Sequence, residues 1–165
     1  MRRKLNRLFR DLLADNRYLL LGQSIRDPYG GASKVTRGLS TAFDTQVINC
    51  PISESAMIGI STGLAMRGFR PITEIMFSDF MTLCTDQLFN VAVKLRDLHE
   101  IELNITIRTM QGMPDYGPTH SQDMDWLQIP GVNYHRNDID AYSLGGINVI
   151  TENRESYENS DNWSG

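Results

Sequence analysis

Residues 49–80 read NCPISESAMIGISTGLAMRGFRPITEIMFSDF. A short strand, predicted over residues 46–50, ends in Pro51-Ile52-Ser53-Glu54, and a helix rich in small residues is predicted over residues 54–67. A second strand, predicted over residues 71–77, ends in Ser78-Asp79-Phe80. Open α/β sheets bind ligands at the carboxyl ends of their strands. Both strands therefore place candidate functional residues at the ligand-binding edge of a sheet.

The composition is that of a globular protein. The 165 residues suffice for one domain with a substantial core, and 41% are hydrophobic and 22% charged. A net charge of −4, without a basic and aromatic stripe, gives no reason to expect a nucleic acid partner. No stretch approaches the roughly 20 apolar residues that span a bilayer, and the basic N-terminus lacks the apolar block of a secretory signal. We expect a cytoplasmic protein with no membrane partner.

Strand and helix patterns alternate along the chain. Besides the elements above, we expect an amphipathic helix, a buried strand, two helices, a third strand and a loop rich in Gly and Pro, over residues 3–14, 18–22, 32–43, 79–100, 103–108 and 109–122. This alternation predicts an α/β fold, a single three-layer domain with a mainly parallel sheet flanked by helices.

Three segments differ in character. Residues 1–21 hold the N-terminal amphipathic helix and the first strand, and residues 22–132 form the most organised unit. Residues 133–165 are rich in Asn, Asp, Glu and Ser, with little to bury, so we expect a polar, weakly ordered tail. Cys50 and Cys84 have no metal-ligand spacing, so we expect reduced thiols and no metal site on this chain.

The residues from Pro51 to Phe80, together with Gly117-Pro118-Thr119-His120-Ser121-Gln122, resemble the pyrimidine-binding domain of thiamine diphosphate enzymes. The resemblance is greatest to the β subunit of the 2-oxo acid dehydrogenase decarboxylase component, and it extends over residues 22–132. It implies a subunit that activates thiamine diphosphate for decarboxylation of a 2-oxo acid, in a dehydrogenase or transketolase-like enzyme.

Glu54 is the first candidate catalytic and cofactor-binding residue. The resemblance implies that its carboxyl group meets a ring nitrogen of the cofactor's aminopyrimidine and favours the tautomer that removes the thiazolium proton. A simpler interpretation is that a Glu in the first turn of a helix interacts favourably with the helix dipole.

Three apolar residues are candidate contacts of the pyrimidine. By the same resemblance, Phe80 stacks on the ring, while Ile52 and Met76 flank it. Aromatic and aliphatic residues at strand ends are also ordinary core residues, which is the alternative for all three.

His120 is the second candidate catalytic residue. The resemblance implies that it faces the reacting end of the cofactor, where a pKa near neutrality suits charge stabilisation or acyl transfer to a lipoyl arm. The preceding loop, residues 110–116, lacks the family's Arg-Thr-Pro and double glycine.

The family's other half carries Gly-Asp-Gly, which binds Mg²⁺ and diphosphate, and that tripeptide is absent from this sequence. The resemblance therefore implies a diphosphate-binding α-type partner subunit that holds Mg²⁺ and shares the cofactor, self-association within a heterotetramer, and contact with a lipoyl domain. The family's C-terminal domain is not recognisable after residue 132. The alternative is a truncated, non-catalytic homologue that acts as an interaction subunit.

Overall fold

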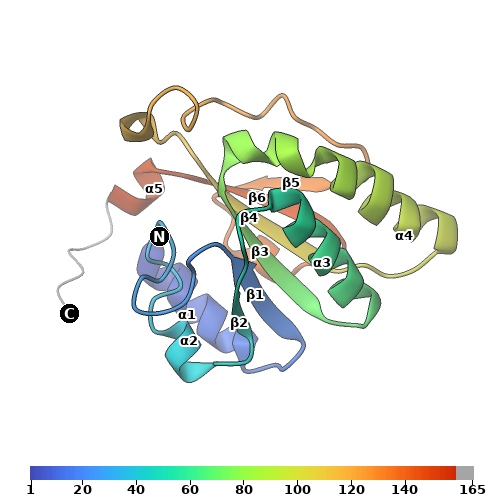
Figure 1. Cartoon of the computed structure of the whole chain (residues 1–165), viewed down its shortest axis with the longest axis horizontal. Helices are drawn as coiled ribbons and strands as arrows, with labels where there is room; N and C mark the ends of the chain where they lie inside the picture. Colours follow the sequence, from blue (N-terminus) through green and yellow to red (C-terminus); the bar gives the residue numbers. More distant parts are fainter. Residues whose placement is uncertain (159–165) are drawn as a thin grey trace.

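The computed structural model describes residues 1–158. Six strands form one sheet in the order β2-β1-β3-β4-β6-β5, and each neighbouring pair is parallel. The strands are β1 (Tyr18–Gly22), β2 (Val47–Asn49), β3 (Arg70–Phe77), β4 (Ile105–Gln111), β5 (Asn133–Arg136) and β6 (Ile147–Asn153). Helices cover both faces of this sheet (Figure 1). The predicted α/β fold is confirmed.

Each face of the sheet has its own core. On one face, α1 (Arg2–Leu13) and α2 (Leu39–Ala42) pack on a cluster that includes Leu5, Phe9 and Leu13, which recur at helical spacing. On the other face, α3 (Glu54–Met66) and the helical residues 78–99 enclose a second cluster around Ile75 and Ile107. Because β1 lies inside the sheet between β2 and β3, residues 1–21 belong to the same domain as the residues that follow.

The helix predicted over residues 79–100 is irregular. It begins as a 3₁₀ turn (Ser78–Cys84), continues as a π-helical stretch (Gln87–Val93) and ends as α4 (Lys94–His99). π-Helical stretches inside helices are frequent at functional sites. The 3₁₀ turn follows directly from the end of β3 and contains Phe80, and the π-helical stretch begins seven residues after Phe80.

The predicted helix over residues 32–43 is mostly absent. Only α2 is helical, because Gly31, Lys34 and Gly38 have backbone φ angles of +76°, +59° and +78°, which interrupt a right-handed helix. Residues 23–38 instead form a loop that lies against the buried end of Glu74.

The expectation of a weakly ordered tail is wrong for residues 133–158. These residues form β5, a 3₁₀ turn (Asp140–Ser143), β6 and α5 (Glu155–Glu158), and β6 lies inside the sheet between β4 and β5. The polar residues are buried because they find partners: Asn148 bonds the Gly145 and Gly146 carbonyls, and Glu152 pairs with Arg108. The rest of the predicted tail, residues 159–165, lies outside the described residues.

A buried charge network joins β3, β4 and β6. Arg108 forms ion pairs with both Glu74 and Glu152, and these three side chains are 1%, 5% and 1% exposed. The hydroxyls of Tyr142 and Tyr157 donate to Glu152. Burial raises the pKa of Glu74, and Arg108 opposes that effect. This network fixes β6 to the central strands β3 and β4.

Within residues 1–158, no helix has the length and apolar character needed to cross a membrane.

Candidate functional site

The candidate residues gather at one edge of the sheet, where the parallel strands end. Gln23 follows β1, the segment to Glu54 follows β2, Ser78 to Phe80 follow β3, and the loop with His120 follows β4. This edge is the one at which open α/β sheets bind ligands.

Glu54 begins α3 and is 6% exposed. Ser53 occupies the N-cap position, but its side chain makes no capping hydrogen bond. Gln23 Nε2 donates a hydrogen bond of 2.8 Å to Glu54 Oε1. Among the described residues, Glu54 Oε2 accepts no hydrogen bond, and this oxygen is not fully buried. The carboxyl group is therefore held by one oxygen and has the other available.

Glu54 lies close to the segment that carries Phe80. The Cys84 thiol, one turn after Phe80, donates to the Phe80 carbonyl over 3.7 Å. Burial, and secondarily the charge of Glu54, raise the pKa of Cys84 to about 12. Cys84, itself a member of the core cluster, is therefore a neutral thiol near pH 7 and adds no charge beside Glu54.

An aromatic cluster connects Phe80 with His120. The ring centroid of His120 lies 4.9 Å from that of Phe77 and 5.3 Å from that of Phe80, with interplanar angles of 85° and 76°. Tyr116 lies against Phe77 at 5.4 Å. Edge-to-face contacts of this kind are favourable. The structure therefore brings together two of the residues that the sequence singled out, 40 positions apart.

Asp79 fastens the loop that carries His120. Its Oδ1 accepts a hydrogen bond of 3.2 Å from the Gln122 backbone N–H, and the side chain is only 7% exposed. Within the loop, the Thr119 hydroxyl lies 2.9 Å from His120 Nδ1 and the Ser121 hydroxyl donates to the Gly117 carbonyl. Residues on both sides of His120 are thus tied down.

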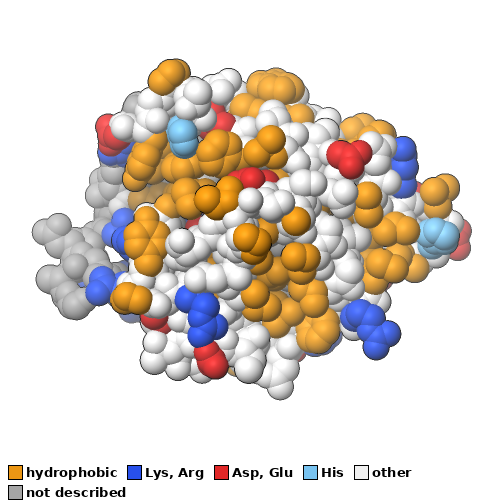
Figure 2. Space-filling view, in the orientation of Figure 1, with side chains coloured by type: hydrophobic (Ala, Val, Ile, Leu, Met, Phe, Trp, Pro, Cys, Tyr) orange, Lys and Arg blue, Asp and Glu red, His pale blue; other side chains and the backbone are white. Residues whose placement is uncertain are grey.

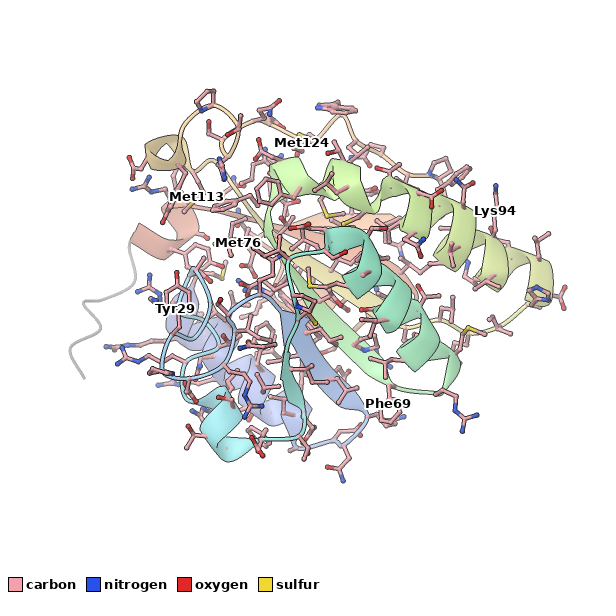
Figure 3. The ribbon with its side chains drawn as sticks, viewed as in Figure 1. Tyr29, Phe69, Met76, Lys94, Met113 and Met124 are labelled. Atoms are coloured by element: carbon pink, nitrogen blue, oxygen red, sulfur yellow. The ribbon has the colours of Figure 1, made fainter. Side chains whose placement is uncertain are left out.

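Ile52 and Met76 leave apolar surface accessible at the same edge. Ile52 is 83% exposed, an unusual environment for an isoleucine. Met76 is partly buried near the carboxyl end of β3, where Figure 3 labels it. Core packing, the alternative for these residues, does not describe Ile52.

No cluster of three or more His, Cys, Asp or Glu side chains that could hold a metal ion occurs within residues 1–158. Cys50 and Cys84 are both free thiols.

Sequence reasoning overlooked three contacts of the site. Gln23 directly follows strand β1, so the rule for strand ends could have found it. Asp79 stands beside Phe80 in a segment already singled out, but its bond to Gln122 spans 43 residues. Phe77, the last residue of β3, is buried and also contacts His120.

A parallel sheet with helices on both faces and candidate functional residues at its carboxyl edge defines the class of α/β domains that bind ligands at that edge. Residues 2–135 match the family described as transketolase, pyrimidine binding domain. The chain belongs to this family.

Two curated relatives are beta subunits. The chain is 37% identical over 136 residues to the acetoin:2,6-dichlorophenolindophenol oxidoreductase subunit beta of Cupriavidus necator, with 74% of this chain and 40% of the relative aligned. It is 36% identical over 148 residues to the 3-methyl-2-oxobutanoate dehydrogenase subunit beta of Mycobacterium tuberculosis, with 87% of this chain and 38% of the relative aligned. The chain therefore spans less than half the length of these relatives.

A solved structure, titled split gene transketolase, inactive beta4 tetramer, has the same fold. It superposes with a TM-score of 0.63 over 91% of this chain and 49% of that chain, at 17% sequence identity.

Proposed function

We propose that the chain is the pyrimidine-binding, β-type subunit of a thiamine diphosphate-dependent 2-oxo acid dehydrogenase or a transketolase-like enzyme. The observation that carries the proposal is the position of Glu54, which is buried at the start of α3 and held by Gln23 through one oxygen only. The names of the curated beta-subunit relatives support the same assignment.

The residues present fit the pyrimidine half of the cofactor. A flat heterocycle needs a hydrogen-bonding group at its edge and apolar side chains against its faces. Glu54 Oε2 would supply the first, and Phe80, Ile52 and Met76 would supply the second. Thiamine diphosphate, when bound, supplies the carbanion-stabilising thiazolium on which 2-oxo acid decarboxylation depends.

His120 would act beside the reacting centre. Phe77 and Phe80 hold its ring edge-on, and Asp79 holds its loop through Gln122. A neutral imidazole accepts a proton and an imidazolium donates one near neutral pH. We propose that His120 moves a proton during the reaction or during acyl transfer to a lipoyl group.

The proposed partner is a diphosphate-binding α-type subunit, which would hold Mg²⁺ and the diphosphate. Exposed apolar side chains gather on the face formed by α3 and the helical residues 78–99 (Figure 2). They include Ile52, Ile60, Leu83 and Phe89, which are 83%, 48%, 56% and 37% exposed. Contiguous apolar surface is typical of interaction sites, so this face fits a subunit interface, with the α-type partner or with a second β-type chain in a heterotetramer.

A second candidate is a non-catalytic interaction subunit. The exposed apolar side chains of Ile60, Leu83 and Phe89 favour it, because they offer a docking surface without any catalytic group. The juxtaposition of Phe80 with His120 near Glu54 favours the catalytic role, because subunit docking does not require it.

Calorimetric titration tests the proposal. Thiamine diphosphate with Mg²⁺ is titrated into the chain alone, and then into its mixture with an α-type subunit bearing the Gly-Asp-Gly sequence, while turnover of 2-oxo acids is followed. We expect binding and turnover with the mixture and neither with the chain alone. A stable mixture that binds no cofactor would establish the interaction subunit instead.

A further inference from the structure

Two buried carboxyl groups share one cation in the interior of the domain. Glu74 and Glu152 are 5% and 1% exposed, and among the described residues Arg108 is the one positive side chain that pairs with them. Burial raises the pKa of both Tyr142 and Tyr157, so these phenols are neutral near pH 7. With both carboxyl groups ionised, the cluster would hold one negative charge without a counter-charge, and burying such a charge is costly.

Hydrogen-bond donors are divided unequally between the two carboxyl groups. Glu152 accepts from Arg108 through both its oxygens. It also accepts from the hydroxyls of Tyr142 and Tyr157. Glu74 accepts only from Arg108 Nη1, through Oε2, and its buried Oε1 has no partner among the described residues. Because donors favour the ionised form of an acid, the geometry favours Glu152 as the anion and a proton on Glu74.

The unpartnered oxygen of Glu74 faces the loop formed by residues 23–38. A Cβ atom built on Gly31 would lie 3.2 Å from Glu74 Oε1, so the backbone of this loop closes directly over the carboxyl group. Within the part of the chain that the structure describes, no charged side chain of the loop pairs with Glu74. The neighbours of Glu74 in register, Gly22 of β1 and Arg108 of β4, are held in the sheet. The loop is therefore the neighbour that can move.

The same loop supports Glu54. Gln23, its first residue, donates a hydrogen bond of 2.8 Å to Glu54 Oε1. The Gly31 N–H donates to the carbonyl of Ser24, the residue after Gln23, at 2.9 Å. The segment that covers Glu74 is thus bonded directly beside the residue that holds the proposed catalytic acid.

We propose that Glu74 holds a proton near neutral pH, and that its ionisation in alkali loosens the 23–38 loop and the hydrogen bond from Gln23 to Glu54. An ionised Glu74 gains hydration only when the loop moves off Oε1, because the strands on either side are fixed. The consequence for catalysis rests on the proposed function of Glu54, whereas the proton and the loop movement do not.

NMR of the whole chain, labelled with ¹³C in its glutamate side chains, reads the proton directly. The Cδ signal of Glu74 is identified by its absence in Glu74→Gln. At about pH 6 an ordinary glutamate is ionised, but we expect the Glu74 signal at the position of a protonated carboxyl group. A signal at the carboxylate position at this pH would overturn the proposal.

Proton linkage gives a second, independent readout. Unfolded Glu74 ionises near its ordinary pKa of 4.5, whereas burial raises the pKa in the folded chain. Between these values only the folded chain keeps the proton, so wild type loses stability relative to Glu74→Gln as the pH rises. The ratio of their unfolding equilibrium constants should change about tenfold per pH unit.

Urea unfolding at several pH values measures this ratio. Glu100→Gln, which changes an exposed glutamate, is the matched control and should give a ratio to wild type that does not vary above about pH 6. A constant ratio for Glu74→Gln, or a Glu74→Gln chain that does not fold, would mean that Glu74 is needed as an anion.

The side-chain amide of Gln23 reports on the loop. In wild type, its ¹⁵N and ¹H signals should move with the same midpoint as the Glu74 carbon signal, and in Glu74→Gln they should not. Gln23 signals that stay in place until the chain unfolds would overturn the link between this proton and the loop. All three measurements use the chain without cofactor, so an absence of turnover in the assembled enzyme would count against the proposed function alone.

Discussion

Asp79 Oδ1 accepts the backbone N–H of Gln122 at 3.2 Å, and this bond joins the end of β3 to the loop that carries His120. The acceptor is a carboxylate and is 7% exposed, so water competes weakly for it. The relative position of Phe80 and His120 therefore depends on Asp79, which is not itself one of the proposed cofactor contacts.

Asp79→Ala should release the loop. Hydrogen bonds to charged groups contribute about 1.5–3 kcal/mol, so we expect the Gln122 amide to exchange with solvent at least about tenfold faster. Hydrogen exchange followed by NMR measures this rate. Asp79→Asn keeps an acceptor oxygen and is the matched control. Equal exchange rates in wild type and Asp79→Ala would show that the bond does not hold the loop.

Glu54→Gln should abolish cofactor-dependent turnover of the assembled enzyme. The variant keeps an oxygen for Gln23 but loses the acid, and general acid–base steps contribute about 100-fold or more. Turnover with the α-type partner is compared with the thermal midpoint, which should stay unchanged. Wild-type turnover would exclude Glu54 from catalysis.

Phe80→Leu should weaken cofactor binding in the assembled enzyme. Loss of an aromatic stacking contact of about 1 kcal/mol corresponds to roughly fivefold in affinity. Phe43→Leu, on the opposite face of the sheet, controls for the loss of a partly buried ring. Calorimetry gives both affinities, and equal values would assign Phe80 to the core alone.

Arg108→Met should destabilise the domain strongly. The change leaves the Glu74 and Glu152 carboxylates buried together without a cation, and breaking buried pairs costs about 3–5 kcal/mol. Denaturant unfolding measures the loss. Arg17→Met breaks an exposed ion pair with Asp15 and should leave the unfolding midpoint unchanged. Equal effects of the two variants would contradict a structural role for the network.

Acid should remove a stabilising contribution of Asp27. Burial alone would raise the pKa of Asp27, but hydrogen bonds from the Gly38 and Thr41 N–H groups and from the Ser40 and Thr41 hydroxyls lower it from 3.8 to about 2. A carboxyl with a lowered pKa in the folded state stabilises above its unfolded pKa and loses that contribution as the pH falls through the folded value.

The stability difference between wild type and Asp27→Asn should therefore be full above about pH 4 and shrink towards pH 2. Urea unfolding at several pH values measures the difference. A difference that stays constant across this range would mean that Asp27 acts without its charge.

The sequence predicted most of the fold where local and long-range preferences agree. The helix at Glu54–Met66 and the strand at Arg70–Phe77 follow the expected boundaries within a residue or so, because small-residue and β-branched patterns match their positions. Residues 133–158 were mistaken for a tail because their polar side chains are buried only through distant partners. Arg108, for example, lies 44 residues before Glu152.

The sequence predicted individual residues of the candidate site but not how their side chains are arranged. The strand-end rule and the family resemblance singled out Glu54, Phe80 and His120, but neither fixes the spacing of their side chains. The positions of Phe80 and His120 follow from Phe77 and from the bond between Asp79 and Gln122, which join segments about 40 residues apart. Such contacts leave no periodic signal in a single sequence.

The place of β6 between β4 and β5 constrains how the chain can fold during synthesis. β6 follows β5 along the chain but enters the sheet between β4 and β5, and within residues 1–158 β5 pairs with no other strand. Until residues 147–153 leave the ribosome, β5 has no neighbour, β4 exposes an unpaired edge, and Arg108 lacks one of its two carboxylates. The addition of β6 therefore supplies the neighbour of β5 and the second carboxylate of Arg108 in the same event.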